Sequence, residues 1–192
     1  MHAFPGPVDP SMRYDHINVP ADGAPITANP NHSLNVPDFP VIPFIEGDCI
    51  GINVTPVMLD VVNVAVEKPY GKNRATKWMQ VYAGAKAVEI YGENEVWPDE
   101  TVHASQKYMV SIKGLLSTPT GGCIGIAPGA NFADSVGVFE TTHGTAPGFA
   151  GKDRVNPGSL ILSAAMLLRY IDWDEATDLI VKDVGITIAN GE

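Results

Sequence analysis

A loop rich in glycine and hydroxyl groups carries the clearest chemical signal in this sequence. It follows an apolar run at 136–139 and reads ETTHGTAPGFAGKDRVNPGS, with four glycines inside fifteen residues. A loop of this kind, ending at a helix N-terminus, can bring several backbone N–H donors to a phosphate, and His143 offers a ring for stacking or a hydrogen bond. The alternative is a long surface loop whose glycines serve only turns.

Other candidate groups carry weaker signals. Cys49 and Cys123 form no CxxC pair and have no evident base beside them, which favours packing residues over nucleophiles or metal ligands. Glu46 and Asp48 could act as an acid pair, but two carboxylates in a turn are typical of solvated capping groups. Lys113 is typical of the solvated end of a strand. Neither GxGxxG after the first strand nor GxxxxGK(S/T) occurs, so an ordinary dinucleotide fingerprint or P-loop is not supported.

Composition and charge exclude several classes of function. The chain has 192 residues, with 12 Lys and Arg against 22 Asp and Glu, for a net charge of −10. The negative electrostatic field of such a chain repels nucleic acid and anionic membrane surfaces, so neither is expected as a partner. We find no apolar run long enough to span a bilayer and no basic flank leading into an apolar signal segment. The sequence favours a soluble cytoplasmic protein.

Hydrophobic patterning predicts the elements that position these loops. Strands are predicted at 41–45, 77–82, 109–113 and 136–140. Helices are predicted from Thr55-Pro56, from Pro98 to about Tyr108, from Asn156-Pro157 through 171, and from Asp174. The first helix is apolar on most sides, as expected beneath a sheet. Strands that alternate with helices predict an α/β fold, a mainly parallel sheet with helices on both faces. Ligands bind beyond the carboxyl ends of such strands.

The N-terminal segment has a different composition. Its first forty-three residues hold nine of the sixteen prolines, and proline blocks helix and removes a backbone donor. We therefore expect an extended, loosely held arm over residues 1–35, followed by a single α/β domain over residues 36–192.

Several long segments carry a resemblance to a known family. They are LNVPDFPVIPFIEGD, VTPVMLDVVNVAVEK, WMQVYAGAKAVEIYG, VSIKG followed by STPTGG, and IGIAPGAN through FETTHGTAPGFAGKDRVNPGSLILSAAMLLRYIDWDEATDLIVK. In these runs the chain resembles the NADP-dependent isocitrate dehydrogenases of the bacterial type. The resemblance covers most of the chain beyond about Asn31 and is specific, because long runs agree in the same order. It implies the large domain of the isocitrate/isopropylmalate dehydrogenase-like fold.

The family resemblance also implies an activity and a set of site residues. Such an oxidoreductase of the tricarboxylic acid cycle transfers a hydride from isocitrate to NADP and releases carbon dioxide, with Mg²⁺ or Mn²⁺ as Lewis acid. Its members are homodimers. Carried over by motif, Ser117 and Thr118 lie beside the nicotinamide ribose, and Glu140 lies near the nicotinamide. The residues around the adenosine part are His143, Gly144, Thr145, Ala146, Pro147 and, at the adenine, Asn156.

The chain departs from the family pattern in the middle. Family members have a long segment between the TPxGGG loop and the IGIAPGAN strand, whereas here Gly121-Gly122-Cys123 runs directly into Ile124. The missing segment carries the residues that grip isocitrate, the acid and base, and the aspartates that hold the metal. It forms a smaller domain that supplies most of the dimer contact. We therefore assign no catalytic and no metal-binding residue, and we expect two separated parts of the large domain to be joined at 121–123.

Two further departures concern the 2′-phosphate of NADP. Gly148 and Phe149 stand where NADP-selective members carry a lysine and a tyrosine, and a lost charge-assisted contact costs about 1.5–3 kcal/mol. The family's C-terminal stretch, which adds contacts to this phosphate, is also missing beyond Glu192. NAD therefore stays open beside NADP as the cofactor, and isocitrate stays open as a ligand.

Three hypotheses follow for the chain. It is an isocitrate dehydrogenase by lineage and cofactor site, a catalytically silent nucleotide-binding or interaction domain, or a truncated remnant without function. For the chemistry of this chain the sequence favours the second or third, because the groups that orient and polarise the substrate are missing.

Overall fold

A computed structural model describes residues 9, 12–117, 127–142, 144–152 and 154–190. The predictions made for Thr118, His143 and the junction at 121–123 lie outside these residues. Among the described residues, no helix is both long enough and apolar enough to cross a membrane.

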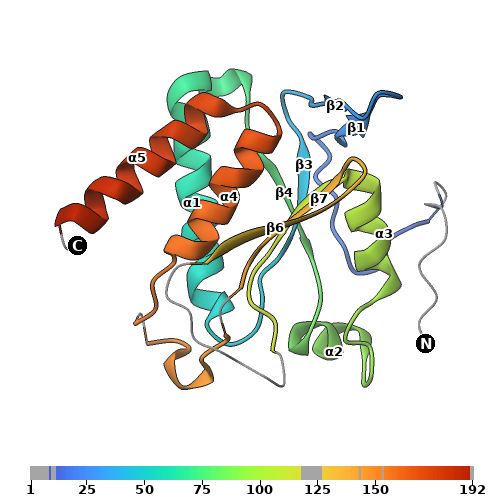
Figure 1. Ribbon diagram of the computed structural model, residues 1–192. Coiled ribbons are helices and arrows are strands. Elements are labelled where there is room, and N and C mark those ends of the chain that lie inside the picture. Colours follow the sequence, from blue (N-terminus) through green and yellow to red (C-terminus); the bar gives the residue numbers. More distant parts are fainter. Residues whose placement is uncertain (1–8, 10–11, 118–126, 143, 153, 191–192) are drawn as a thin grey trace.

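The centre of the fold is a five-stranded sheet in the order β4-β3-β5-β7-β6 (Figure 1). Its parallel strands are β3 (Val41–Ile45), β4 (Lys77–Val81), β5 (Val110–Lys113) and β7 (Val136–Thr141). These four confirm the predicted strands to within one residue at each end. The fifth, β6 (Pro128–Ala133), runs antiparallel to β7 and was not predicted from its composition. Proline, glycine and asparagine disfavour strands, so β6 owes its conformation to the hydrogen bonds offered by β7.

Helices cover both faces of the sheet, which confirms the predicted α/β class. α1 (Gly51–Tyr70), α4 (Gly158–Tyr170) and α5 (Asp174–Asn190) lie on one face, and α3 (Asp99–Tyr108) lies on the other (Figure 1). Each face of the sheet has its own hydrophobic core, and successive residues of β3 point into one or the other. Ile42 packs under α1 and α4, and Val41 packs under α3. Three shorter helices complete the fold: α2 (Ala85–Tyr91), η1 (Gly71–Asn73) and η2 (Pro147–Phe149).

The start of α1 differs from the prediction. The helix begins at Gly51, one turn before Thr55-Pro56, and Pro56 lies inside it. The Gly51 N–H donates to the Asp48 carbonyl at 2.8 Å, and the Thr55 hydroxyl donates to the Glu46 carbonyl at 2.7 Å. Thr55 therefore ties the helix to the preceding turn and does not cap it. The other three helices start where predicted, within two residues.

The N-terminal segment is not loosely held, contrary to expectation. Ile26 is fully buried in the main core, and Ile17 is buried on the other face. A short hairpin of β1 (Thr27–Ala28) and β2 (Leu34–Asn35) follows, and Ala24 bridges to Pro40 beside the sheet. The prolines keep this segment extended, but its isoleucines attach it to the domain. The boundary between an arm and a domain at residue 35 stays a prediction.

Candidate functional site

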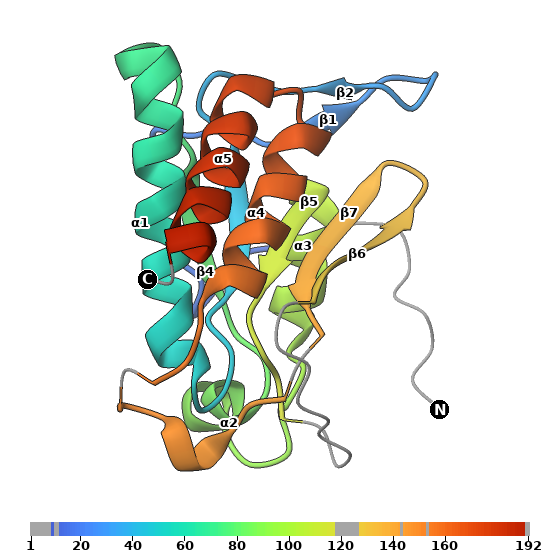
Figure 2. The same ribbon diagram turned by 60° about the vertical axis from the view of Figure 1, so that its left-hand side comes forward.

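The carboxyl ends of the parallel strands meet at one edge of the sheet, the lower edge in Figures 1 and 2. Asp48, in the turn after β3, is buried there with 6% of its surface exposed. Its carboxylate accepts hydrogen bonds from the Ala85 N–H (3.0 Å), at the start of α2, and from the Ser117 N–H (2.7 Å), after β5. The Asp48 N–H in turn donates to the Leu115 carbonyl at 2.6 Å. One carboxylate thus fastens three strand-end loops together.

Glycines allow these loops to approach so closely. Gly47 has φ +90°, and a Cβ built on it would lie 2.5 Å from the Leu115 carbonyl oxygen. Gly84 has φ +68°, and its Cβ would lie 2.8 Å from both carboxylate oxygens of Asp48. A side chain at either position would be strained and would separate the loops.

The glycine-rich loop after β7 reaches the same turn. The Ile50 N–H donates to the Thr145 carbonyl at 3.3 Å, and the Gly151 N–H donates to Asn53 Oδ1 at 2.8 Å. The loop therefore lies against the N-terminal turn of α1. Because Ser117 binds Asp48 and Thr145 binds Ile50, the predicted ribose and adenosine segments come together on residues 48–50.

The remaining predicted residues occupy different surroundings. Gly148 and Phe149 belong to η2 and are exposed, and Ala146 adopts a left-handed conformation with φ +39° just before it. Asn156 is exposed before α4, where its Oδ1 accepts the Gly158 N–H at 2.7 Å. It also lines a groove between α1 and α5, and the lining of that groove includes neither Ser117 nor Thr145.

Charged side chains at this edge are paired with one another. Glu140, at the end of β7, forms an ion pair with Lys113 of β5 and accepts a hydrogen bond from Asn131 Nδ2 at 2.7 Å. Glu46 forms an ion pair with Lys86. Both acids were expected to be solvated capping groups, but Asp48 is buried and only Glu46 is partly exposed.

These carboxylates do not fit a divalent cation. Asp48 is satisfied by two backbone donors, and Glu46 and Glu140 are each held by a lysine. A hard cation needs several free oxygen ligands converging on one point. Within the described ranges, no group of three histidine, cysteine or acidic side chains lies together in a way that could hold a metal ion.

One buried hydroxyl stands out beside the loop. Thr141, the last residue of β7, is buried, and its Oγ1 has no hydrogen-bond partner among the residues that the structure describes. Buried polar groups are nearly always paired, because leaving one unpaired costs about 1–3 kcal/mol.

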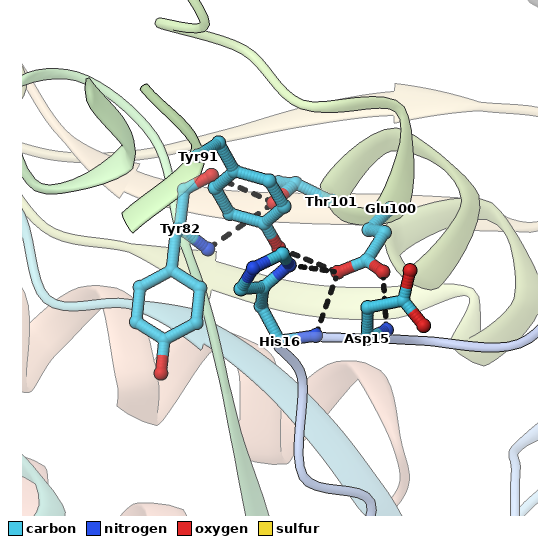
Figure 3. A network of polar contacts seen from close by, with 6 residues as sticks. All are labelled: Asp15, His16, Tyr82, Tyr91, Glu100 and Thr101. Atoms are coloured by element: carbon cyan, nitrogen blue, oxygen red, sulfur yellow. Dashed lines mark hydrogen bonds and ion pairs between the residues drawn. The ribbon is translucent and has the colours of Figure 1, made fainter. Parts of the chain in front are cut away.

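A second polar network lies on the opposite face of the sheet, and the sequence did not predict it. Glu100, in the first turn of α3, is buried and accepts the Asp15 N–H at 2.5 Å and the Tyr91 hydroxyl at 2.6 Å (Figure 3). The His16 ring lies against Tyr91, with centroids 4.4 Å apart. Burial, and then the hydrogen bond to Glu100, raises the pKa of Tyr91 above its ordinary value. Glu100 thus anchors the N-terminal segment to α2 and α3.

The neighbour of Glu100 connects this network to the sheet. The Thr101 hydroxyl donates to the Tyr82 carbonyl at 2.7 Å and accepts the Tyr82 N–H at 3.1 Å, directly after β4 (Figure 3). In the sequence, Glu100 is recognisable only as an acid in the first turn of a helix. That position indicates where the helix starts and does not reveal which distant residues Glu100 binds.

Comparison with known proteins identifies the relatives of this chain. Residues 117–192 match the family model described as isocitrate/isopropylmalate dehydrogenase. The isocitrate dehydrogenase (NADP) of Coxiella burnetii aligns over 382 residues with 27% identity, across 90% of this chain and 89% of that protein. The isocitrate dehydrogenase (NADP) 1 of Psychrobacter sp. is 53% identical over 111 residues, 58% of this chain and 26% of that protein. The chain resembles the NADP-dependent isocitrate dehydrogenases.

The long alignment agrees with the resemblance to a large domain without its smaller partner. It runs over 382 residues, about twice the 192 residues of the chain, and therefore contains long gaps. Two solved structures below 25% identity show the fold. The TT0538 protein of Thermus thermophilus has a TM-score of 0.72 at 17% identity, over 88% of this chain and 66% of that one. The isocitrate dehydrogenase of Methylococcus capsulatus has a TM-score of 0.64 at 16% identity, over 79% and 91%.

Proposed function

We propose that this chain binds NADP at the carboxyl edge of its sheet and does not turn over isocitrate without further residues. The observation that carries the proposal is the meeting of two loops on one turn, with Ser117 held by Asp48 and Thr145 held by Ile50. In the family resemblance these loops bind the two ends of one cofactor.

The charge of the loop after β7 supports a nucleotide ligand. Residues 144–152 contain no acidic side chain, although the whole chain has a net charge of −10. Lys152 ends this stretch, and Asp153 and Arg154 follow it, so the segment 144–154 has a net charge of +1 in sequence; the N-terminal turn of α1 adds the positive end of a helix dipole. At Asn156, the Gly158 N–H fixes the side-chain oxygen, which leaves the amide nitrogen to donate to an adenine ring.

Lys152 supports NADP over NAD. Its Nζ donates to the Gly148 carbonyl at 2.7 Å, so a cation lies where the resemblance places the 2′-phosphate contact. Lys152 can therefore take the role of the lysine that NADP-selective family members carry at the position of Gly148. The cofactor, when bound, would supply hydride acceptance, while Ser117 and the loop after β7 would hold and orient it.

The proposed absence of turnover rests on the groups that would have to bind and polarise isocitrate. Hydride transfer from isocitrate requires groups that bind its carboxylates and polarise its hydroxyl, and these supply most of a rate enhancement. The described carboxylates at this edge are already paired, as set out above. The second candidate function is isocitrate oxidation itself, which is favoured by the names of the relatives.

One pair of measurements tests both candidates. Calorimetric titration with NADP and NAD should give binding, tighter for NADP, and a spectrophotometric assay with isocitrate, Mg²⁺ and NADP should give no reduced cofactor above background. Asn156→Ala should weaken NADP binding, whereas the same change at the exposed Asn18 should not. Failure of both nucleotides to bind would refute the proposal, and turnover would establish the second candidate instead.

A further inference from the structure

The short helix α2 connects the candidate site with the network around Glu100. It lies at the carboxyl edge of the sheet (Figures 1 and 2), and of its residues, Ala85–Tyr91, only Ala87 is buried. The position of a helix in a fold is normally fixed by an apolar face that packs against the core. Because α2 has a single buried residue, its position depends mainly on the contacts that its two ends make.

The first turn of α2 is fastened to the turn after β3. The Ala85 N–H donates to the Asp48 carboxylate at 3.0 Å, and Lys86 forms an ion pair with Glu46. The same Asp48 carboxylate accepts the Ser117 N–H at 2.7 Å. A shift of the first turn of α2 therefore removes one of the two donors that hold this carboxylate, and it loosens the anchor of Ser117.

The last turn of α2 is fastened to α3 and to the N-terminal segment. The Tyr91 hydroxyl donates to Glu100 Oε2 at 2.6 Å (Figure 3). The Tyr91 ring lies against the His16 ring, and its centroid is 6.2 Å from that of Tyr82. Glu100 accepts the Asp15 N–H as well. Tyr91 thus joins the C-terminal end of α2 to two other parts of the chain.

Glu100 is a fixed support for Tyr91. The next residue of α3, Thr101, exchanges two hydrogen bonds with the backbone of Tyr82, which ties the helix to the end of β4 (Figure 3). Tyr108, at the other end of α3, is buried in the core on this face of the sheet. A hydroxyl that donates to a carboxylate forms a stronger bond than one between neutral groups. The position of Tyr91 is therefore set by a part of the fold that lies outside the candidate site.

We propose that Tyr91 is a positioning residue for the nucleotide site and acts on it through α2 and the Asp48 carboxylate. The inference rests on the proposed function, which makes the turn around Asp48 and the Ser117 loop the place where NADP binds. With its last turn held on Glu100, α2 presents the Ala85 N–H to Asp48, and Asp48 in turn holds Ser117. Without that bond, α2 occupies this position in a smaller fraction of molecules, and the affinity for nucleotide falls by that fraction.

Tyr91→Phe tests the proposal, because it removes the hydroxyl and keeps the ring contacts. In calorimetric titration, the dissociation constant for NADP should rise by about threefold or more. The Ala85 amide proton, followed by NMR without nucleotide, should exchange with solvent about threefold faster or more, because its bond to Asp48 opens more often. Tyr70→Phe is the matched control. The Tyr70 hydroxyl also donates to a glutamate, Glu175, but at the far end of α1, so neither quantity should change.

A double variant separates positioning from a general loss of stability. On the Asp48→Asn background, Tyr91→Phe should raise the dissociation constant by less than about twofold, because the contact through which it acts is already weakened. Additive effects of the two substitutions would overturn the proposal, and so would a Tyr91→Phe variant in which either the NADP affinity or the Ala85 exchange rate is unchanged. If the unchanged chain binds neither NADP nor NAD, the proposed function is refuted instead, and the exchange rates still show whether Tyr91 holds α2 on Asp48.

Discussion

Replacing Asp48 with asparagine should loosen the candidate site by a predictable amount. The carboxylate accepts two backbone N–H groups, and hydrogen bonds to a charged group contribute about 1.5–3 kcal/mol each. Asparagine keeps one acceptor and turns an NH₂ group toward the other donor, so one bond is lost and the other weakened. Ala85 and Ser117 are exposed residues, and water can partly replace the lost partner. We therefore expect a loss of about 2 kcal/mol in the free energy of unfolding.

Urea denaturation measures this loss directly. A change of about 2 kcal/mol corresponds to a midpoint about 4–8 °C lower in thermal unfolding for a chain of this size. Glu46→Gln is the matched control, because it removes an acid from the same turn but breaks only a surface ion pair, worth about 0–1 kcal/mol. Asp48→Asn should also weaken NADP binding, since Ser117 loses its anchor. Equal effects of the two substitutions on stability would refute the role of Asp48 as the residue that joins the loops.

Three further substitutions have defined outcomes. Lys152→Ala should lower the affinity for NADP about tenfold, as expected for one charge-assisted contact, and leave NAD binding unchanged in calorimetry. Thr141→Val should raise the free energy of unfolding by about 1 kcal/mol, because it removes an unpaired buried hydroxyl; a loss would show that the hydroxyl has a partner. The pKa of Tyr91 is raised above 10.0 by burial and by Glu100, so its contribution to stability is lost as pH rises above 10.0. Tyr91→Phe should make the alkaline decline in urea-measured stability shallower.

The strands of the sheet were predictable because local pattern and tertiary role agree there. Val41–Ile45 is a short apolar run, and such a run suits a strand with helices on both faces, which is where it lies. The start of α4 was predictable for a similar reason. Asn156 and Pro157 are a cap and a first-turn residue in sequence, and Asn156 does accept the first helical N–H.

The elements that were missed depend on partners far away in the chain. β6 is a strand only because β7 offers it hydrogen bonds, since its own residues disfavour the conformation. The N-terminal segment has the composition of a loose arm, yet Ile26 is buried in the core and the Asp15 N–H binds Glu100, 85 positions away. Proline content predicts the local backbone and carries no information about such contacts.

The same reasoning explains what could be foreseen of the site. Glycine and hydroxyl spacing pointed to the loop after β7, because a phosphate-binding loop needs those residues locally. Asp48 looked like a solvated turn acid, since nothing in the turn reveals that Ala85 and Ser117 come to it. The residue that joins the loops was therefore present in the sequence without a recognisable signal.

Under the proposed function, the arrangement of these contacts separates nucleotide binding from turnover. The hydrogen bonds that join the two predicted cofactor loops run among the turn after β3, the start of α2 and the loops after β5 and β7, all at the carboxyl edge of the sheet. None of them involves the segment that family members carry between the residues matching Gly121-Gly122-Cys123 and Ile124. Under the proposed function, nucleotide binding therefore does not depend on the groups that would act on isocitrate.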